Sequence, residues 1–388
     1  MTAPTSPLPR AVVVFGFVSL LNDFAAEMVA PLVPILLATT LNAGPAVLGL
    51  IEGVAEAVSN LLKLWSGRHS DLHGRRKPYI AGGYLLSNIA RPLMAISGSW
   101  LTVLAIRVTD RVGKGIRTTP RDALAADAVT QANAGRAFGF MRKLDHAGAV
   151  LGTLAAAAII YFGSQRLEIV IALSAIPGIA AVSLIIFGVK ETARAPRASS
   201  QLALLRWTLL HLKTRTYLAT LGFFTIGKIP ESFLLLRGHE LGMSVVELLL
   251  LWAAMHVVKV AVAERAGGYT DRVGRRPVIL AAWITYAVTL LAMAFAHAPL
   301  WLWLSSAGLG IYFGFSEGAE RALVRDLAVP EEYGTAFGWY HMISGMAAVL
   351  AGLLLGGLWS ICGASTAFVV SSVIATLGVF SFWRYVRT

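Results

Sequence analysis

Apolar residues fill long stretches of this chain, and the stretches recur from one end of it to the other. A run of about 20 apolar residues is long enough to cross a bilayer as an α-helix. Twelve membrane-spanning helices are predicted, near residues 10–38, 45–67, 78–98, 100–127, 134–163, 168–189, 216–237, 244–266, 277–296, 299–327, 333–360 and 364–386. Long continuous runs favour helices over the short alternating strands of a barrel. The sequence therefore predicts an all-α polytopic membrane protein.

The first predicted span contains Pro31 and Pro34, which indicate a kink or break within the helix rather than its end. Its apolar run is too long for the core of a signal peptide, so we expect it to be retained as a helix.

Charge is sparse, and its placement indicates topology. Charged residues make up 14% of the chain, against about 25% in a soluble domain. The net charge of +12 comes from basic residues in alternate connections, mainly Arg75, Arg76, Lys77, Arg136, Arg142, Lys143, Lys190, Arg194, Arg275, Arg276 and Arg384. By the positive-inside rule, both termini are expected in the cytoplasm, with the protein in the cell (inner) membrane. This placement argues against a nucleic-acid partner.

The two halves of the chain repeat each other at an offset of about 200 residues. Gly67 to Arg76 matches Gly267 to Arg276, and Asp127 matches Asp326. We expect an N-terminal six-helix domain over 1–189, a cytoplasmic linker over 190–215 and a C-terminal six-helix domain over 216–388. Within the linker, Leu202, Leu205, Leu209 and Leu212 recur at helical spacing, which fits either an amphipathic surface helix or a plain spacer.

The repeated Gly-x-x-x-Asp-x-x-Gly-Arg-Arg loop follows the second span of each half, at 67–76 and 267–276. With the Arg111 to Gly115 run on the fourth span, it makes the chain resemble the major facilitator superfamily of secondary transporters over essentially its whole length. The resemblance implies two six-helix domains, a central substrate cavity and alternating access. The Gly-Pro motif of many drug–proton antiporters is missing at 148–157, which weakens that assignment.

The resemblance also implies a set of gating residues at the cytoplasmic mouth. In the first half, Asp71 would face a helix end of the other domain, and Asp127 would pair with Arg75. Their counterparts in the second half are Asp271, Arg275 and Asp326. The alternative is that these charges only determine topology.

The fourth span carries most of the candidate binding chemistry. One helical face holds Arg107, Asp110, Arg111, Lys114, Arg117, Arg121 and Asp122. A basic side chain near the bilayer centre costs about 2.5–3.5 kcal/mol, so these must line a cavity or be paired. We expect the substrate to bind Arg111, Lys114 and Arg117 together with Glu317, Glu320 and Arg321 on the matching tenth span, since guanidinium groups suit carboxylates and phosphates. The alternative is a satisfied lattice of ion pairs.

Asp23 and Glu27 lie one turn apart on the first span and are the candidates for proton coupling, because neighbouring buried carboxyls tend to keep a proton. Permanent pairing with Arg111 or Arg117, or direct contact with the substrate or a cation, are the alternatives. His146, His256 and His341 are either proton relays or hydrogen-bonded core residues. We expect no metal or other cofactor, and no phosphate-binding loop for ATP occurs in the sequence.

Together these features favour a secondary active transporter, and not an enzyme, for a small polar anionic or zwitterionic organic solute. We expect proton coupling, export from general resemblance to efflux members, and action as a monomer with solute, protons and the bilayer as partners. A multidrug–proton antiporter is the alternative within transport, although its site should carry few buried charges. A membrane sensor would be expected to carry a soluble signalling domain. A lipid flippase-like protein would need a lateral opening.

Overall fold

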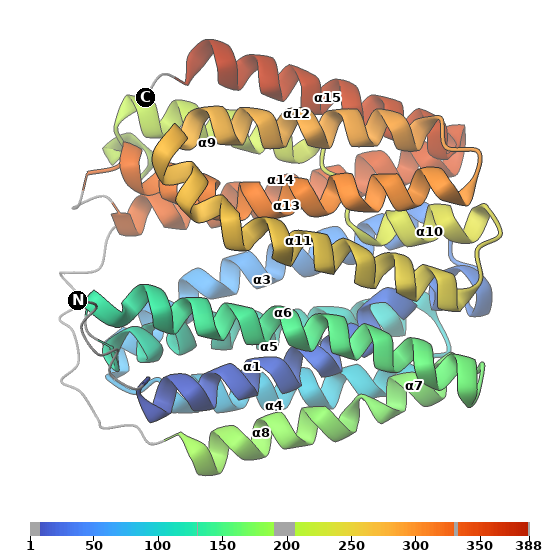
Figure 1. Cartoon of the computed structure of the whole chain (residues 1–388), viewed down its shortest axis with the longest axis horizontal. Coiled ribbons are helices and arrows are strands. Elements are labelled where there is room, and N and C mark those ends of the chain that lie inside the picture. The colour runs from blue at the N-terminus through green and yellow to red at the C-terminus, as the bar shows by residue number, and fades with distance from the viewer. Residues whose placement is uncertain (1–7, 130, 190–205, 330–332, 387–388) are drawn as a thin grey trace, which may run out of the picture.

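A computed structural model describes residues 8–129, 131–189, 206–329 and 333–386 (Figure 1). The chain is an all-α polytopic membrane protein, and the described residues contain no strand. Its main helices are α1 (Arg10–Val29), α3 (Pro45–His73), α4 (Lys77–Leu93), α5 (Trp100–Asp127), α6 (Gln131–Phe162), α7 (Leu167–Leu173), α8 (Ala175–Gly188), α9 (Leu212–Ile226), α10 (Ser232–Glu240), α11 (Val245–Val273), α12 (Arg275–Ala294), α13 (Pro299–Leu327), α14 (Tyr333–Cys362) and α15 (Ala364–Tyr385).

The helix bounds follow the predicted spans closely, but two interruptions matter for the site. As the prolines predict, the first span changes its winding after α1, through a 3₁₀ turn at Ala30–Leu32, the short α2 (Val33–Ile35) and a π-turn at Leu36–Thr40. The seventh span was expected to be continuous, and this is wrong, because residues 227–231 separate α9 from α10. Pro230 has no backbone N–H for a helical bond.

Eight helical segments among the described residues are long and apolar enough to cross a membrane by length and composition. The remaining predicted spans fall short for visible reasons. The helix α4 has 17 residues, α9 and α10 are short pieces of a broken span, and α5 and α13 carry several charged residues. Charged helices of this kind are stable in a bilayer when neighbouring helices cover them.

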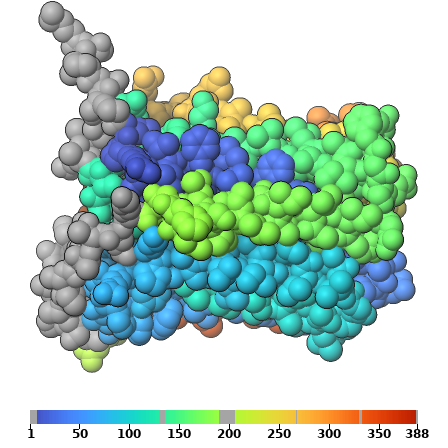
Figure 2. All heavy atoms as spheres, turned by 90° about the horizontal axis from the view of Figure 1, so that it is seen from below, coloured from blue at the N-terminus to red at the C-terminus, as the bar shows by residue number. Residues whose placement is uncertain are grey.

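The helices run side by side in two groups, α1–α8 and α9–α15 (Figure 1). Both termini lie at one end of the bundle, which we call the terminal face; the other end is the opposite face. Figure 2 shows α7 and α8 along the outside of the first group, between α1 and α4. Ile176, Ile179 and Phe187 of α8 are exposed there, as expected of a lipid-facing surface.

The two groups meet along α3 and α14, and along α6 and α11. Between α3 and α14 lies a row of small residues that we call the glycine seam: Gly49, Gly53, Gly345, Gly352 and Gly356. Their lack of side chains brings the two backbones into contact. The contact runs from Gly356 beside Pro45, near the opposite face, to Gly345 beside Asn60, near mid-helix. The two ribbons diverge toward the terminal face (Figure 1), so the opposite face is the closed one.

Part of the predicted linker, 190–205, lies outside the described residues, and so do Leu202 and Leu205 of its predicted amphipathic helix. The described remainder begins with a short 3₁₀ turn at Trp207–Leu209, and α9 starts at Leu212.

Candidate functional site

The part of the α5 basic face that lies nearer the opposite face is neutralised by ion pairs inside the first group of helices. Arg107 donates to both carboxylate oxygens of Glu52 on α3, at 3.1 and 3.0 Å. Asp110 accepts from Arg91 of α4 at 2.9 Å, and Arg91 also reaches the Asn22 side chain at 3.1 Å. All these side chains are buried or nearly so. Sequence reasoning missed Glu52, although an acid in a predicted span is itself a signal.

The inner part of the same face is satisfied as well. Arg117 is 5% exposed, donates to the Ser87 hydroxyl at 2.6 Å and lies 4.3 Å above the Tyr84 ring. Arg121 pairs with its neighbour Asp122 at 2.9 Å and lies 3.8 Å from Asp145 of α6. The structure therefore places the Arg117 side chain against α4, apart from those of Arg111 and Lys114.

Arg111 and Lys114, in the middle of the face, differ from their neighbours. Within the described ranges neither has an ion pair or a hydrogen bond from its side chain, and the Arg111 Nε is buried without an acceptor. Both are partly exposed. Their electrostatic neighbours include Lys63 and Glu56 of α3, and Asp23.

The α3 partners form a short chain of polar contacts that sequence reasoning also missed. Lys63 Nζ donates to the Asn60 side chain at 2.9 Å, and Asn60 donates to Glu56 at 3.1 Å. Asn60 also lies beside Gly345 of the glycine seam. Lys63, Lys114 and Arg111 all act on Glu56 electrostatically, at the point where the two groups of helices separate. These bases outnumber the neighbouring acids, Glu56 and Asp23.

On α13 the three predicted residues do not share one environment. Glu317 pairs with Lys259 of α11 at 2.9 Å and lies 4.0 Å from Arg142 of α6, in the other group of helices. Arg321 is exposed and interacts with the Tyr340 hydroxyl. Glu320 differs from these two: it is 5% exposed and accepts from Trp283 Nε1 at 2.9 Å, inside the second group.

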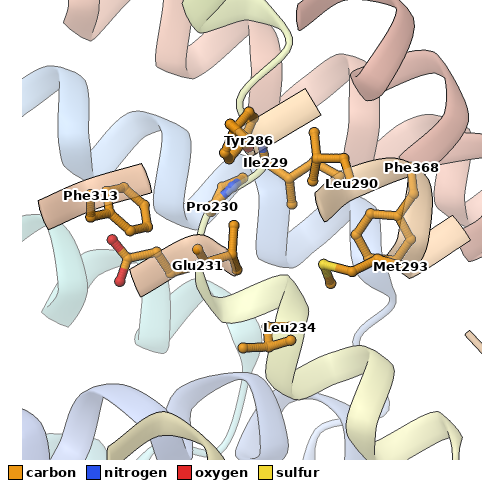
Figure 3. Close-up of a pocket in the computed structure, with 10 residues that line it drawn as sticks. Ile229, Pro230, Glu231, Leu234, Tyr286, Leu290, Met293, Phe313 and Phe368 are labelled. Carbon is orange, nitrogen blue, oxygen red and sulfur yellow. Dashed lines mark hydrogen bonds between the residues drawn. The ribbon is translucent and has the colours of Figure 1, made fainter. Parts of the chain in front are cut away.

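The break between α9 and α10 adds polar groups beside α13. The Ile229 N–H donates to the Tyr286 hydroxyl at 2.9 Å, and Lys228 Nζ lies 5.4 Å from the Tyr312 ring centre. A cavity of about 10 Å³ opens behind the break, large enough for about one water. Figure 3 shows the Glu231 carboxylate beside the Phe313 ring at the edge of this cavity.

In the described part of the chain, neither candidate proton-coupling acid forms an ion pair with an arginine or a lysine. Asp23 accepts from the neighbouring Asn22 side chain at 2.9 Å. Glu27 accepts from Trp252 Nε1 of α11 at 2.8 Å and lies 3.8 Å from His256. Permanent pairing with Arg111 or Arg117, one of the alternatives drawn from the sequence, is not what the structure shows.

The repeated loops at the terminal face pair differently from the expected pattern. Asp127 binds Arg76, which also holds Asp71 at 2.8 Å, whereas Arg75 is exposed; the expected partner was therefore wrong by one residue. In the second half, Arg275 binds Asp271 and lies 3.4 Å from Asp326.

The cause of this difference is one extra residue in the first loop. Lys77 stands between the arginine pair and Pro78, while Arg276 is followed directly by Pro277. Aligned on the prolines, Arg76 corresponds to Arg275. The next residues also agree, because Lys77 donates to the Ile186 carbonyl and Arg276 to the Trp383 carbonyl, each on the last helix of its half.

Comparison with known proteins agrees with this architecture. The Major Facilitator Superfamily profile matches residues 15–263 and 232–388. An uncharacterized MFS-type transporter of Methanocaldococcus jannaschii is 29% identical over 378 residues, covering 95% of this chain and 93% of the relative. The nucleoside transporter NupG superposes with a TM-score of 0.74 at 14% identity, covering 97% of this chain and 99% of NupG. A D-xylose–proton symporter superposes with 0.75 at 15% identity, covering 97% and 98%. The paired six-helix halves, the repeated loops and these matches together show that this chain belongs to the major facilitator superfamily.

Proposed function

We propose that this transporter moves small organic anions, or zwitterions with an anionic group, through a central site between its two groups of helices. The observation that carries the proposal is the pair Arg111 and Lys114, two partly buried cations that form no ion pair or hydrogen bond with any described side chain. Uncompensated charge in a low-dielectric interior is costly. A bound carboxylate or phosphate would supply the missing charge, and the Arg111 fork suits its geometry.

The surrounding groups carry both signs of charge, which suits a polar solute. Lys63 and Glu56 lie beside the two bases, and Arg321 of α13 is near Lys63 from the other group of helices. A solute bound here would contact both groups of helices at once. Its binding would then depend on the relative position of the two groups, as alternating access requires.

We further propose that transport is coupled to protons through Asp23 and Glu27 and runs as export from the cytoplasm, with the terminal face cytoplasmic. Both acids are partly buried, and neither forms an ion pair with an arginine or a lysine among the described residues.

Thermal stabilisation tests the anion site. A ligand present at about 100 times its Kd stabilises the folded state by about 2.7 kcal/mol and raises the melting temperature. We expect stabilisation by some members of a panel of organic anions and zwitterions at about pH 6 and about pH 8. The effect should disappear in Arg111→Ala and Lys114→Ala. It should survive in Arg75→Ala, a matched loss of one positive charge at an exposed position.

Stabilisation only by hydrophobic cations, unchanged in Arg111→Ala and Lys114→Ala, would contradict the proposal and favour a multidrug transporter. Coupling is tested with a stabilising anion in proteoliposomes. A pH gradient should drive its net movement in the native protein, and Asp23→Asn or Glu27→Gln should abolish that movement while anion exchange continues. The sign of the gradient that drives movement gives the direction.

A further inference from the structure

The contact between Glu27, Trp252 and His256, which we call the interface cluster, joins residues 225 positions apart in sequence. Glu27 lies in the last turn of α1, just before the 3₁₀ turn at Ala30–Leu32, and belongs to the first group of helices. Trp252 and His256 lie one turn apart on α11, in the second group. Within this cluster, the hydrogen bond from Trp252 Nε1 to Glu27 at 2.8 Å directly connects the two groups.

His256 is the unusual member of this cluster. Its side chain is 9% exposed, and neither ring nitrogen has a hydrogen-bond partner. Buried polar atoms without partners are rare and costly, and where they occur they call for an explanation. The Glu27 carboxylate is a hydrogen-bond acceptor close to this ring, and its Oε2 lies 3.8 Å from His256 Nε2. A side-chain movement of about 1 Å would bring the two atoms to normal hydrogen-bond distance.

The other charged groups around the cluster are already engaged or lie farther away. Those facing His256 are Lys259 on its own helix, Glu317 on α13 and Glu231 at the start of α10. Lys259 and Glu317 bind each other at 2.9 Å. Arg107 of α5 faces Glu27 but is held by Glu52.

The described side chains offer no group of three His, Cys, Asp or Glu that could hold a metal ion. The two facing atoms, a carboxylate oxygen and an imidazole nitrogen, can each bind a proton.

We propose that Glu27 and His256 share one transported proton between Oε2 and Nε2, and that this proton holds the opposite face closed. This rests on the proton coupling proposed above and adds His256 as a second proton-binding residue. With one proton the pair is neutral overall, whichever atom carries it, and burying it between the helix groups costs little. Without that proton the pair carries one negative charge, whose burial is unfavourable. Proton loss then favours separation of the two groups and hydration of Glu27.

The distance across the opposite face tests this directly. Spin labels at Gly98→Cys and His297→Cys, in a Cys362→Ser background, place one probe on each group at exposed positions of that face. Between about pH 5 and about pH 8, we expect a shift from a short to a longer distance. For one linked proton, the ratio of the two populations changes by up to about tenfold per pH unit. Glu27→Gln and His256→Gln should each abolish the pH dependence while both distances remain observable.

Two further variants sharpen the test. Trp252→Phe removes the hydrogen bond but no proton site, so it should raise the long-distance population at every pH and keep the pH dependence. His146→Gln removes a partly buried histidine of α6 that faces Arg142 and Glu317, and should leave the pH dependence intact. A pH dependence unchanged in His256→Gln, absent from the parent protein, or lost only in His146→Gln would overturn the proposal. Anion stabilisation lost in Arg111→Ala would still support the anion site in those cases, so the two proposals fail separately.

Discussion

The glycine seam makes a sharp prediction about the conformational equilibrium. A Cβ added at Gly352 would lie 2.8 Å from the carbonyl carbon of Gly49 and 3.4 Å from its Cα, and closer still to the carbonyl oxygen. These are backbone atoms, so no rotamer change relieves the clash. Under the proposed alternating access, α3 separates from α14 at the opposite face in the other state of the cycle, and the same methyl group would then meet no such contact. Gly352→Ala should therefore destabilise one conformation selectively.

The size of the effect follows from the cost of overpacking. Forcing a methyl group into a filled contact costs about 1–3 kcal/mol. A bias of that size changes the ratio of the two states by about 5- to 150-fold. Because the open state escapes the clash, the loss of unfolding free energy cannot exceed the difference in free energy between the two states. We therefore expect a large change in conformation with a small change in melting temperature.

Spin labels at Gly98→Cys and His297→Cys measure this change, with growth of the longer distance expected in Gly352→Ala. Gly357→Ala is the matched control, since it lies on the same helix and its added Cβ meets nothing within 4 Å. Alanine in place of a helical glycine is favourable by about 0.5–1 kcal/mol, so the control should keep the parent distances and melt no lower. Identical distance distributions in the two variants would refute the role given to the seam.

Two further predictions concern ion pairs inside the first group of helices. Arg76→Ala should alter the conformational equilibrium and lower the melting temperature, because it leaves Asp127 without this partner. Arg75→Ala should change neither, since Arg75 is exposed. Equal effects of the two variants on both measurements would contradict the pairing. Arg107→Ala should lower the unfolding free energy by about 3–5 kcal/mol, since it leaves Glu52 charged and unpaired in the bundle. Thermal melting checks this, and recovery of most of the loss by the double variant with Glu52→Gln would identify the unpaired charge as its cause.

The secondary structure could be predicted largely from the sequence. Twelve apolar runs predict the helices to within a few residues at most ends. A segment inside the bilayer satisfies its backbone hydrogen bonds by forming a helix, and the length of the apolar run indicates where it enters and leaves the membrane. The prolines predicted the irregular end of the first span, and the repeated loops carried the resemblance to the superfamily. These features depend on residues close together in the chain, or on repetition along it, and the sequence displays both directly.

The pairing of buried charges was decided by tertiary structure alone. Helical periodicity predicts that the α5 bases share one face, but it carries no information about which helix covers each turn of that face. Arg107 pairs with Glu52 on α3, while Arg111 and Lys114 form no ion pair among the described residues. A single extra residue, Lys77, moved the Asp127 pairing from Arg75 to Arg76. An ion pair extends over only a few ångströms, so one turn of helix or one residue of loop determines whether a charge is neutralised or left for a ligand.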